Sequence, residues 1–131
     1  CALPICWRVA KCIFVSEEIT TALRYAKSAD GPYGFYFSNL MKKLSGGGRL
    51  GLFGAYPDQP EEEITLEQSL ETQVIAGTPD SVAEQILALR EEIGNFGTLV
   101  YTGLDWADKD LSIKSMELMA NQVMPKVNAA L

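Results

Sequence analysis

Histidine is absent from all 131 residues of the chain. Ser-His-Asp and Cys-His catalysis are therefore excluded within it, and so are histidine-ligated metals. Any acid–base group must be an aspartate, glutamate, lysine, tyrosine or cysteine. Cysteine is scarce as well, and Cys1, Cys6 and Cys12 all lie in the first twelve residues. This cluster has too few ligands at suitable spacings for a metal site, so we expect ordinary reduced cysteines in a cytoplasmic protein.

Basic charge and long apolar runs are also missing. Eleven basic residues against 17 acidic ones give a formal net charge of −6, and no run of lysine or arginine exceeds two residues. The electrostatic footprint of a nucleic-acid-binding protein is therefore absent. No apolar run approaches the roughly 18 residues that a membrane span needs, and no signal peptide is visible. We expect no nucleic-acid partner and no membrane segment.

The residues that are present suit one globular domain, with 47% hydrophobic and 21% charged residues. Short apolar segments, rich in β-branched residues, alternate with amphipathic ones. The short segments predict strands over residues 9–15, 73–76 and 97–102. The amphipathic segments predict helices over residues 17–29, 34–44, 65–72, 79–93 and 108–127. This alternation is typical of βα units with a parallel sheet.

Several predicted helices begin with a capping signal. Ser16 can cap the first helix, and Thr65 with Gln68 forms a capping box. Thr78 is the expected N-cap of the clearest helix, with Pro79 at its first helical position. We expect the first helix to bury Ile19, Leu23 and Ala26, and the last helix to bury Ile113, Met116, Ala120, Val123 and Val127.

A long irregular region interrupts the βα pattern over residues 45–63, which are rich in glycine and proline. Loops of this length in compact domains are usually functional or disordered. The run Gly46-Gly47-Gly48-Arg49 lacks the preceding strand and the GK[ST] ending of a phosphate-binding loop, so we interpret it as a flexible linker.

The periodicity alone leaves two folds open. A whole eight-fold barrel needs roughly 250 residues, so the chain is either part of such a barrel or a smaller α/β fold with a three-to-five-strand sheet. The first residue is Cys1 rather than methionine, which we interpret as a sign of a fragment of something longer.

Four stretches, taken in order, carry a resemblance to a known family. They are VIAGTPDSV at residues 74–82, FGTLVY at 96–101 followed by Asp105-Trp106, SMELMA at 115–120 with VMP at 123–125, and Trp7-Arg8 ahead of VAKCIFV. Together they resemble the carboxy-terminal portion of bacterial-luciferase-like flavin-dependent monooxygenases, in the limonene-monooxygenase-like branch. Each motif alone is weak, whereas the ordered set is fairly specific.

The resemblance implies an α/β fold that is a partial TIM (β/α)8 barrel. Residues 1–131 would form its carboxy-terminal part, the last three βα units from about the sixth strand to the eighth helix. Residues of about 31–72 would form an insertion that helps to cover the active site.

The resemblance also implies an oxidoreductase. Reduced FMN from a separate flavin reductase, together with O2, would insert oxygen into a small organic substrate. Because the first five units of the family's barrel are not matched, we expect this chain to be inactive alone and to bind flavin weakly or not at all. The substrate stays open, and so does the choice between FMN and a deazaflavin, although FMN is favoured.

Candidate site residues lie where the predicted strands end, because barrel enzymes place their chemistry there. Asp105, our catalytic candidate, would transfer a proton or orient a group near the flavin, or else cap the last helix. Trp106 would stack on flavin or substrate, or wedge the last helix against its neighbour. Tyr101 and Glu17 are further cofactor-binding candidates, although Glu17 equally suits a helix amino end. No metal site is expected.

A non-enzymatic interpretation stays open beside the enzyme. Three βα units leave open sheet edges and uncovered apolar helix faces, which invite association with a second copy. The alternative function is therefore a partial barrel that forms homo-oligomers.

Overall fold

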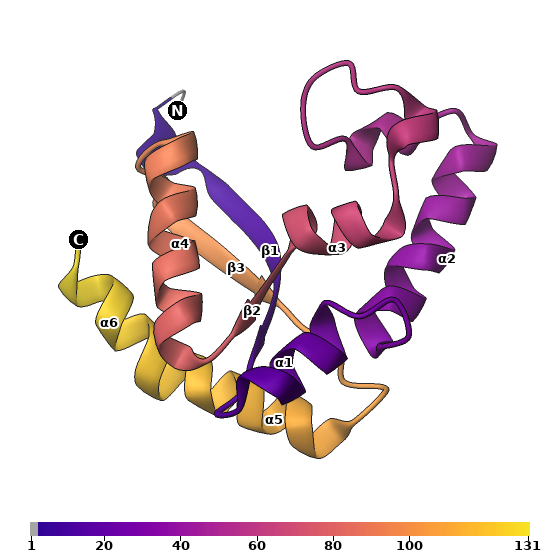
Figure 1. The fold of residues 1–131 in the computed structure, drawn as a ribbon. Coiled ribbons are helices and arrows are strands. Elements are labelled where there is room, and N and C mark those ends of the chain that lie inside the picture. Colours follow the sequence, from indigo (N-terminus) through magenta and orange to yellow (C-terminus); the bar gives the residue numbers. More distant parts are fainter. Residues whose placement is uncertain (1–2) are drawn as a thin grey trace.

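The computed structural model describes residues 3–131 and contains one three-stranded parallel sheet (Figure 1). Its strands are β1 (Arg8–Val15), β2 (Val74–Gly77) and β3 (Thr98–Thr102), in the spatial order β2-β1-β3. The predicted strands are confirmed within about a residue at each end. The α/β alternation and the parallel sheet are confirmed with them.

The helices follow the order expected from the sequence. They are α1 (Ile19–Ala26), α2 (Pro32–Gly46), α3 (Leu66–Gln73), α4 (Pro79–Ile93), α5 (Lys109–Leu118) and α6 (Met124–Ala129), with a π-helical turn over Met119–Val123 between the last two. Short 3-10 turns lie at Pro4–Cys6, Leu50–Phe53 and Glu61–Glu63. The predicted irregular region is therefore confirmed from Gly47 onward, while α2 continues two residues past the predicted helix end at Leu44.

The strand order differs from the one that three consecutive barrel units would give. In a barrel each strand pairs with the strands that precede and follow it, which would place β2 in the middle. Here β1 is central: its first five residues pair with β3, from Arg8 opposite Thr98, and its last four pair with β2, ending at Val15 opposite Gly77. The sheet therefore does not have the strand order that three consecutive barrel units would give.

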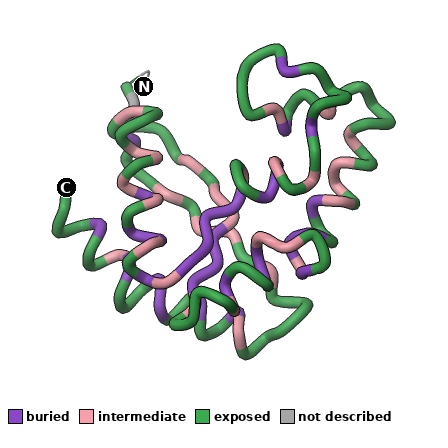
Figure 2. Tube along the Cα trace, viewed as in Figure 1, coloured by how far each residue is buried: buried purple, intermediate pink, exposed green. Residues whose placement is uncertain are grey.

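Helices cover both faces of the sheet, because successive strand residues point to opposite sides. Phe14, Val74 and Ala76 pack on one face against residues of α1, α2 and α3. Ile13, Val15 and Ile75 pack on the other against α4 and the α5–α6 segment. Figure 1 shows the sheet between α4 on one side and α2 with α3 on the other. Figure 2 shows burial concentrated at β2, at the end of β1 and on the inner helix faces.

The buried face of α1 differs from the prediction. Ala22, Tyr25 and Ala26 are buried, whereas Ile19 and Leu23 are each 45% exposed. The ring of Tyr25 stacks on Phe14 with 4.3 Å between centroids, and this contact turns the small residues toward the sheet. Ser16 does not cap the helix either: Glu18 is the N-cap residue, and the Ser16 hydroxyl accepts a bond from its N–H at 3.3 Å.

The last predicted helix also buries a different face. Val123 and Val127 are buried as expected, but Ile113, Met116 and Ala120 are exposed. The buried positions upstream are Ser112, Ser115, Leu118 and Met119. Two causes combine: hydrogen-bonded serines occupy the inner face, and the π-helical turn, which holds an extra residue, shifts that face partway along.

Three smaller expectations are also settled. β3 is an edge strand rather than a fully buried one, since Val100 is 40% exposed. Cys12 is a free thiol, but Cys6 is disulfide-bonded, so the expectation of reduced cysteines is wrong at that position. Cys1 lies outside the described residues.

Within residues 3–131, no helix is long and apolar enough to cross a membrane.

The two threonine caps behave differently and provide a matched test. Thr65 accepts a bond from the Gln68 N–H at 3.2 Å, as predicted, whereas the Thr78 side chain makes no capping bond at the start of α4. Thr65→Ala should lower the free energy of unfolding by about 1 kcal/mol. Thr78→Ala should lower it by less than about 0.5 kcal/mol. Chemical denaturation of both variants checks this, and equal losses would contradict it.

Candidate functional site

The segment after β3 positions the main candidate residues. Residues 103–107 form a loop between the carboxyl end of β3 and α5. Asp108 caps α5, since its carboxylate accepts a bond from the Leu111 N–H at 3.0 Å. Asp105 is exposed and is not the cap, so the alternative role that the sequence left open for it belongs to Asp108.

Asp105 borders a hollow of about 310 Å³ between the end of β3 and α5. The hollow combines one carboxylate, two hydroxyls and apolar side chains, and its lining residues are Tyr101, Gly103, Leu104, Asp105, Ser112 and Met116. The Ser112 hydroxyl donates to the Leu104 carbonyl, which fastens the loop to the first turn of α5. The structure therefore brings Asp105 and Tyr101 to one site, as the sequence suggested.

Tyr101 is half-buried beside this hollow. Its hydroxyl lies 2.9 Å from the Ser115 Oγ. Burial raises the pKa of Tyr101 above its usual value, the Ser115 hydrogen bond acts in the opposite direction, and the nearby Tyr25 adds to the rise. The phenol is therefore neutral near pH 7 and can donate a hydrogen bond.

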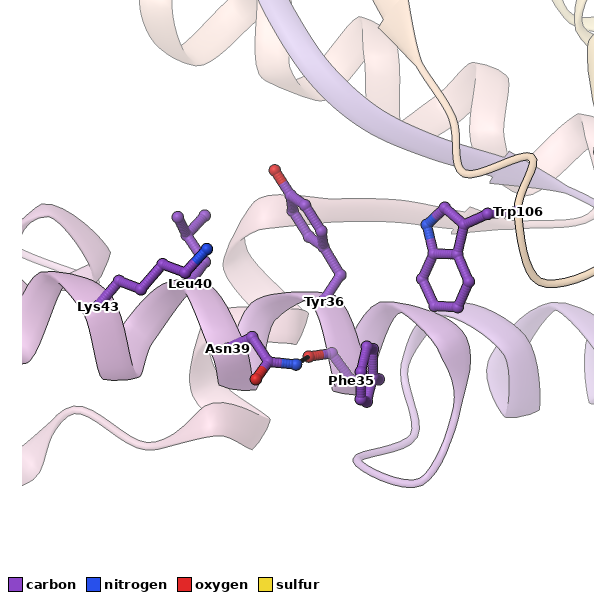
Figure 3. Close-up of a pocket in the computed structure, with 6 residues that line it drawn as sticks. All are labelled: Phe35, Tyr36, Asn39, Leu40, Lys43 and Trp106. Carbon is purple, nitrogen blue, oxygen red and sulfur yellow. Dashed lines mark hydrogen bonds between the residues drawn. The ribbon is translucent and has the colours of Figure 1, made fainter.

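Trp106 faces a different hollow from its neighbour Asp105. Its ring meets Phe35 of α2 edge to face, with 5.7 Å between centroids. The surrounding hollow of about 230 Å³ lies along α2, and its lining residues are Phe35, Tyr36, Asn39, Leu40, Lys43 and Trp106 (Figure 3). The ring contact of Trp106 is therefore with α2.

Glu17 lies apart from both hollows. It is exposed, and its carboxylate pairs with the Lys114 Nζ at 3.5 Å, which links the β1–α1 loop to α5. It borders neither the Asp105 hollow nor the Trp106 hollow. The structure therefore does not bring Glu17 together with Asp105, Trp106 and Tyr101.

Two buried tyrosines, Tyr25 of α1 and Tyr33 of α2, belong to the core cluster on this face of the sheet. The Tyr33 hydroxyl donates to the Ile13 carbonyl at 3.3 Å, and burial raises its pKa well above the usual range, against a smaller opposing contribution from the Leu104 backbone. The Tyr25 hydroxyl is buried and has no hydrogen-bond partner within residues 3–131. The sequence interpretation missed Ser115, because a serine on a helix carries no signal of burial.

The side chains that border the two hollows can contact an organic ligand. Within residues 3–131, no group of three or more cysteine, aspartate or glutamate side chains is placed to hold a metal ion. The aromatic rings of Phe35, Tyr36 and Trp106 border one hollow, and the Tyr101 hydroxyl and Asp105 carboxylate border the other. Such groups contact and orient an organic ring.

Known monooxygenases resemble the chain over most of its length. Limonene 1,2-monooxygenase from Rhodococcus erythropolis is 30% identical over 126 residues, which cover 95% of this chain and 30% of that protein. The 3,6-diketocamphane 1,6-monooxygenase of Pseudomonas putida is 29% identical over 123 residues, which cover 91% and 32%. No family model matches the chain.

A solved structure shows the same relationship. The oxygenating constituent of 3,6-diketocamphane monooxygenase from Pseudomonas putida, a type II Baeyer–Villiger monooxygenase in complex with FMN, aligns with a TM-score of 0.74 and 26% identity. The alignment covers 92% of this chain and 33% of that one. The resemblance to luciferase-like flavin monooxygenases is thereby confirmed, and these enzymes are homologues of the chain. The chain spans about a third of the length of the relatives it matches.

The contact between Trp106 and Phe35 should couple the β3–α5 loop to α2 energetically. Edge-to-face aromatic pairs contribute about 0.5–1.5 kcal/mol beyond their buried area, and this exposed pair should lie near the lower end. A double-mutant cycle of Phe35→Ala and Trp106→Ala, measured by denaturant unfolding, checks this. The matched control combines Trp106→Ala with Tyr56→Ala, another exposed aromatic, whose effects should add. Additivity of the Phe35 and Trp106 effects would contradict the coupling.

Proposed function

We propose that the chain is the carboxy-terminal part of a luciferase-like (β/α)8 barrel whose parent enzyme uses reduced FMN and O2 to insert oxygen into a small organic substrate. The observation that carries this proposal is homology over nearly the whole chain to monooxygenases, one of them solved with FMN. In this proposal residues 1–131 are one part of the barrel domain, and residues of about 31–72 are its insertion.

The strand pairing suggests how the chain fits into a barrel. Neighbouring barrel strands are parallel and joined by a helical connection. β1 and β3 meet this condition over five residue pairs, from Arg8 opposite Thr98 to Cys12 opposite Thr102. We therefore assign β1 and β3 to neighbouring barrel positions. β2 pairs with the other side of β1 over four residue pairs, so the connection from β1 to β3 passes through β2 there and also contains the insertion and α4.

The insertion is suited to a role at the active site. α2 meets the β3–α5 loop through Phe35 and Trp106, at the strand end where barrel enzymes keep their chemistry. A cover built from α2 would exclude water from that end.

The described residues fit part of an FMN molecule. Trp106 and the aromatic side chains of α2 offer ring faces for a planar ligand, and Tyr101 offers a hydroxyl. A phosphate needs several N–H or basic donors, whereas Lys43 is the one basic residue that borders either hollow. We therefore expect the chain alone to bind FMN weakly or not at all. When bound in the parent, reduced FMN supplies the chemistry with O2, and a separate reductase supplies the reduced FMN.

Within the proposed site, Trp106, Tyr101 and Asp105 have different roles. Trp106 would hold the flavin or substrate by ring contact, and Tyr101 would orient it by a hydrogen bond. Asp105 is the one carboxylate bordering the hollow beside Tyr101, and it would hold or accept a proton there. Glu17 has no part in this assignment, because its ion pair with Lys114 holds it at the surface.

The test uses the full-length parent enzyme. Its FMN fluorescence should be quenched on binding, and a substrate should stimulate its O2 uptake. Asp105→Asn should keep the fold and most of the flavin affinity, while turnover falls roughly 100-fold, as expected for a positioned acid–base group. The measurements are steady-state rates and FMN dissociation constants.

Asp108→Asn is the matched control, since Asp108 lies three residues away and serves as the helix cap. Asparagine caps about as well as aspartate, so this variant should keep both turnover and melting temperature. Equal turnover of wild type and Asp105→Asn would remove Asp105 from the site. Failure of the parent to bind FMN in either redox state would overturn the proposed function.

The exposed edge of β3 favours self-association as a second candidate. Thr98–Thr102 reads TLVYT, with no charge and no proline to block pairing, and Val100 is exposed. The isolated chain should therefore form oligomers as its concentration rises. Light scattering of wild type and of Val100→Lys checks this, since an edge lysine should restore the monomer. A wild-type monomer at all concentrations would contradict it.

A further inference from the structure

Ser115 connects three parts of the structure through one buried hydroxyl. It lies on α5, is fully buried, and accepts a hydrogen bond from the Val15 N–H at 2.9 Å, across 100 residues of sequence. The same Oγ lies 2.9 Å from the Tyr101 hydroxyl. The end of β1, the end of β3 and α5 therefore meet at this oxygen. The proposed function assigns Ser115 no role.

The geometry allows either hydroxyl to donate in the second bond, and counting donors and acceptors favours one direction. A serine hydroxyl has one hydrogen to donate and two lone pairs that accept. Val15 can only donate, so it occupies one lone pair of the Ser115 oxygen. The Ser115 hydrogen then needs an acceptor, because an unpaired buried donor is costly. The Tyr101 oxygen is its remaining partner among the hydrogen bonds of residues 3–131.

The direction of this bond decides what Tyr101 can offer. If Ser115 donates to the phenolic oxygen, the hydrogen of Tyr101 is left for another acceptor. Tyr101 borders the hollow together with Asp105. We infer that Ser115 is a positioning residue that holds the Tyr101 hydroxyl as a hydrogen-bond donor toward the Asp105 hollow, ready for an acceptor oxygen of an uncharged ligand.

The surroundings of the hollow limit the ligand class. The Asp105 carboxylate repels anions, and Leu104 and Met116 add apolar surface. The Ser112 hydroxyl is already bonded to the Leu104 carbonyl, so Tyr101 supplies the free side-chain hydroxyl donor. An uncharged organic molecule with one acceptor oxygen matches this set. This inference deepens the proposed site and rests on the proposed function only for the view that the hollow receives substrate.

The sign of a pKa change tests the direction of the bond. The full chain is labelled with 13Cζ-tyrosine and titrated by NMR, and Tyr101→Phe identifies the Tyr101 signal among the five tyrosines. If Ser115 donates, Ser115→Ala removes a bond that favours the phenolate, and the Tyr101 pKa should rise by about one pH unit. If Tyr101 donates instead, the same variant should lower the pKa. A fall or no change in the folded variant would overturn the inference.

Two further variants separate positioning from simple packing. Ser115→Thr keeps the hydroxyl and should restore a Tyr101 pKa close to that of wild type. Ser115→Cys keeps the size but donates weakly, so its pKa should lie between those of wild type and Ser115→Ala. The other titratable groups around Tyr101, which are Tyr25, Tyr33, Cys12 and Asp105, are unchanged in all three variants. Equal pKa values in the folded alanine and threonine variants would show a packing role only and would overturn the inference.

A ligand titration of the wild-type chain keeps the inference testable even if every Ser115 variant unfolds. Cyclohexanone, an uncharged acceptor, should shift the 13Cζ signal of Tyr101 in a saturable way. Cyclohexanecarboxylate, its anionic counterpart, should not. No response to cyclohexanone, or an equal response to both probes, would overturn the ligand class. Neither titration needs flavin, so their outcome is independent of the FMN binding that tests the proposed function.

Discussion

The parallel hydrogen bonding of β1 to both other strands is the constraint on which the arrangement of the chain depends. Cys12 is the residue at which the pairing changes over, because it lies opposite Thr102 on one side and Val74 on the other. Alternation along β1 then sends Phe14 to the layer of α1, α2 and α3, and Ile13 with Val15 to the layer of α4 and α5–α6. Both halves of the core are therefore fixed by one strand.

The two hollows of the candidate site follow from this layering. The loop after β3 leaves the sheet where both helix layers are within reach, so Trp106 meets α2 and Asp105 lies near α5. Neighbouring residues in the sequence thus contact opposite layers. One hollow is an aromatic surface and the other joins a phenol to a carboxylate. A ligand that spans the end of β3 would touch both.

The sequence predicted the strands and the helix order, because short β-branched apolar runs, helical periodicity and turn residues are local signals. It did not predict which face of α1 or α5 is buried. The stacking of Tyr25 on Phe14 turns one face of α1 toward the sheet. On α5, Ser112 and Ser115 turn a face inward through hydrogen bonds to Leu104 and Val15. Such choices depend on partners far away in the sequence. The order of the strands was missed for the same reason, since periodicity does not identify a strand's neighbours.

Tyr101 and Asp105 differ in how firmly the structure holds them, and this difference is relevant to the roles proposed for them. Tyr101 is half-buried and held through Ser115 to the backbone of the central strand, so its hydroxyl has a fixed place. Asp105 is exposed on a loop that is fastened on one side by Ser112 and on the other by the ring of Trp106. A fixed neutral donor suits the orientation of a ligand. The proposed roles follow this difference, with orientation assigned to Tyr101 on the strand and the proton to Asp105 on the loop that contacts α2 through Trp106.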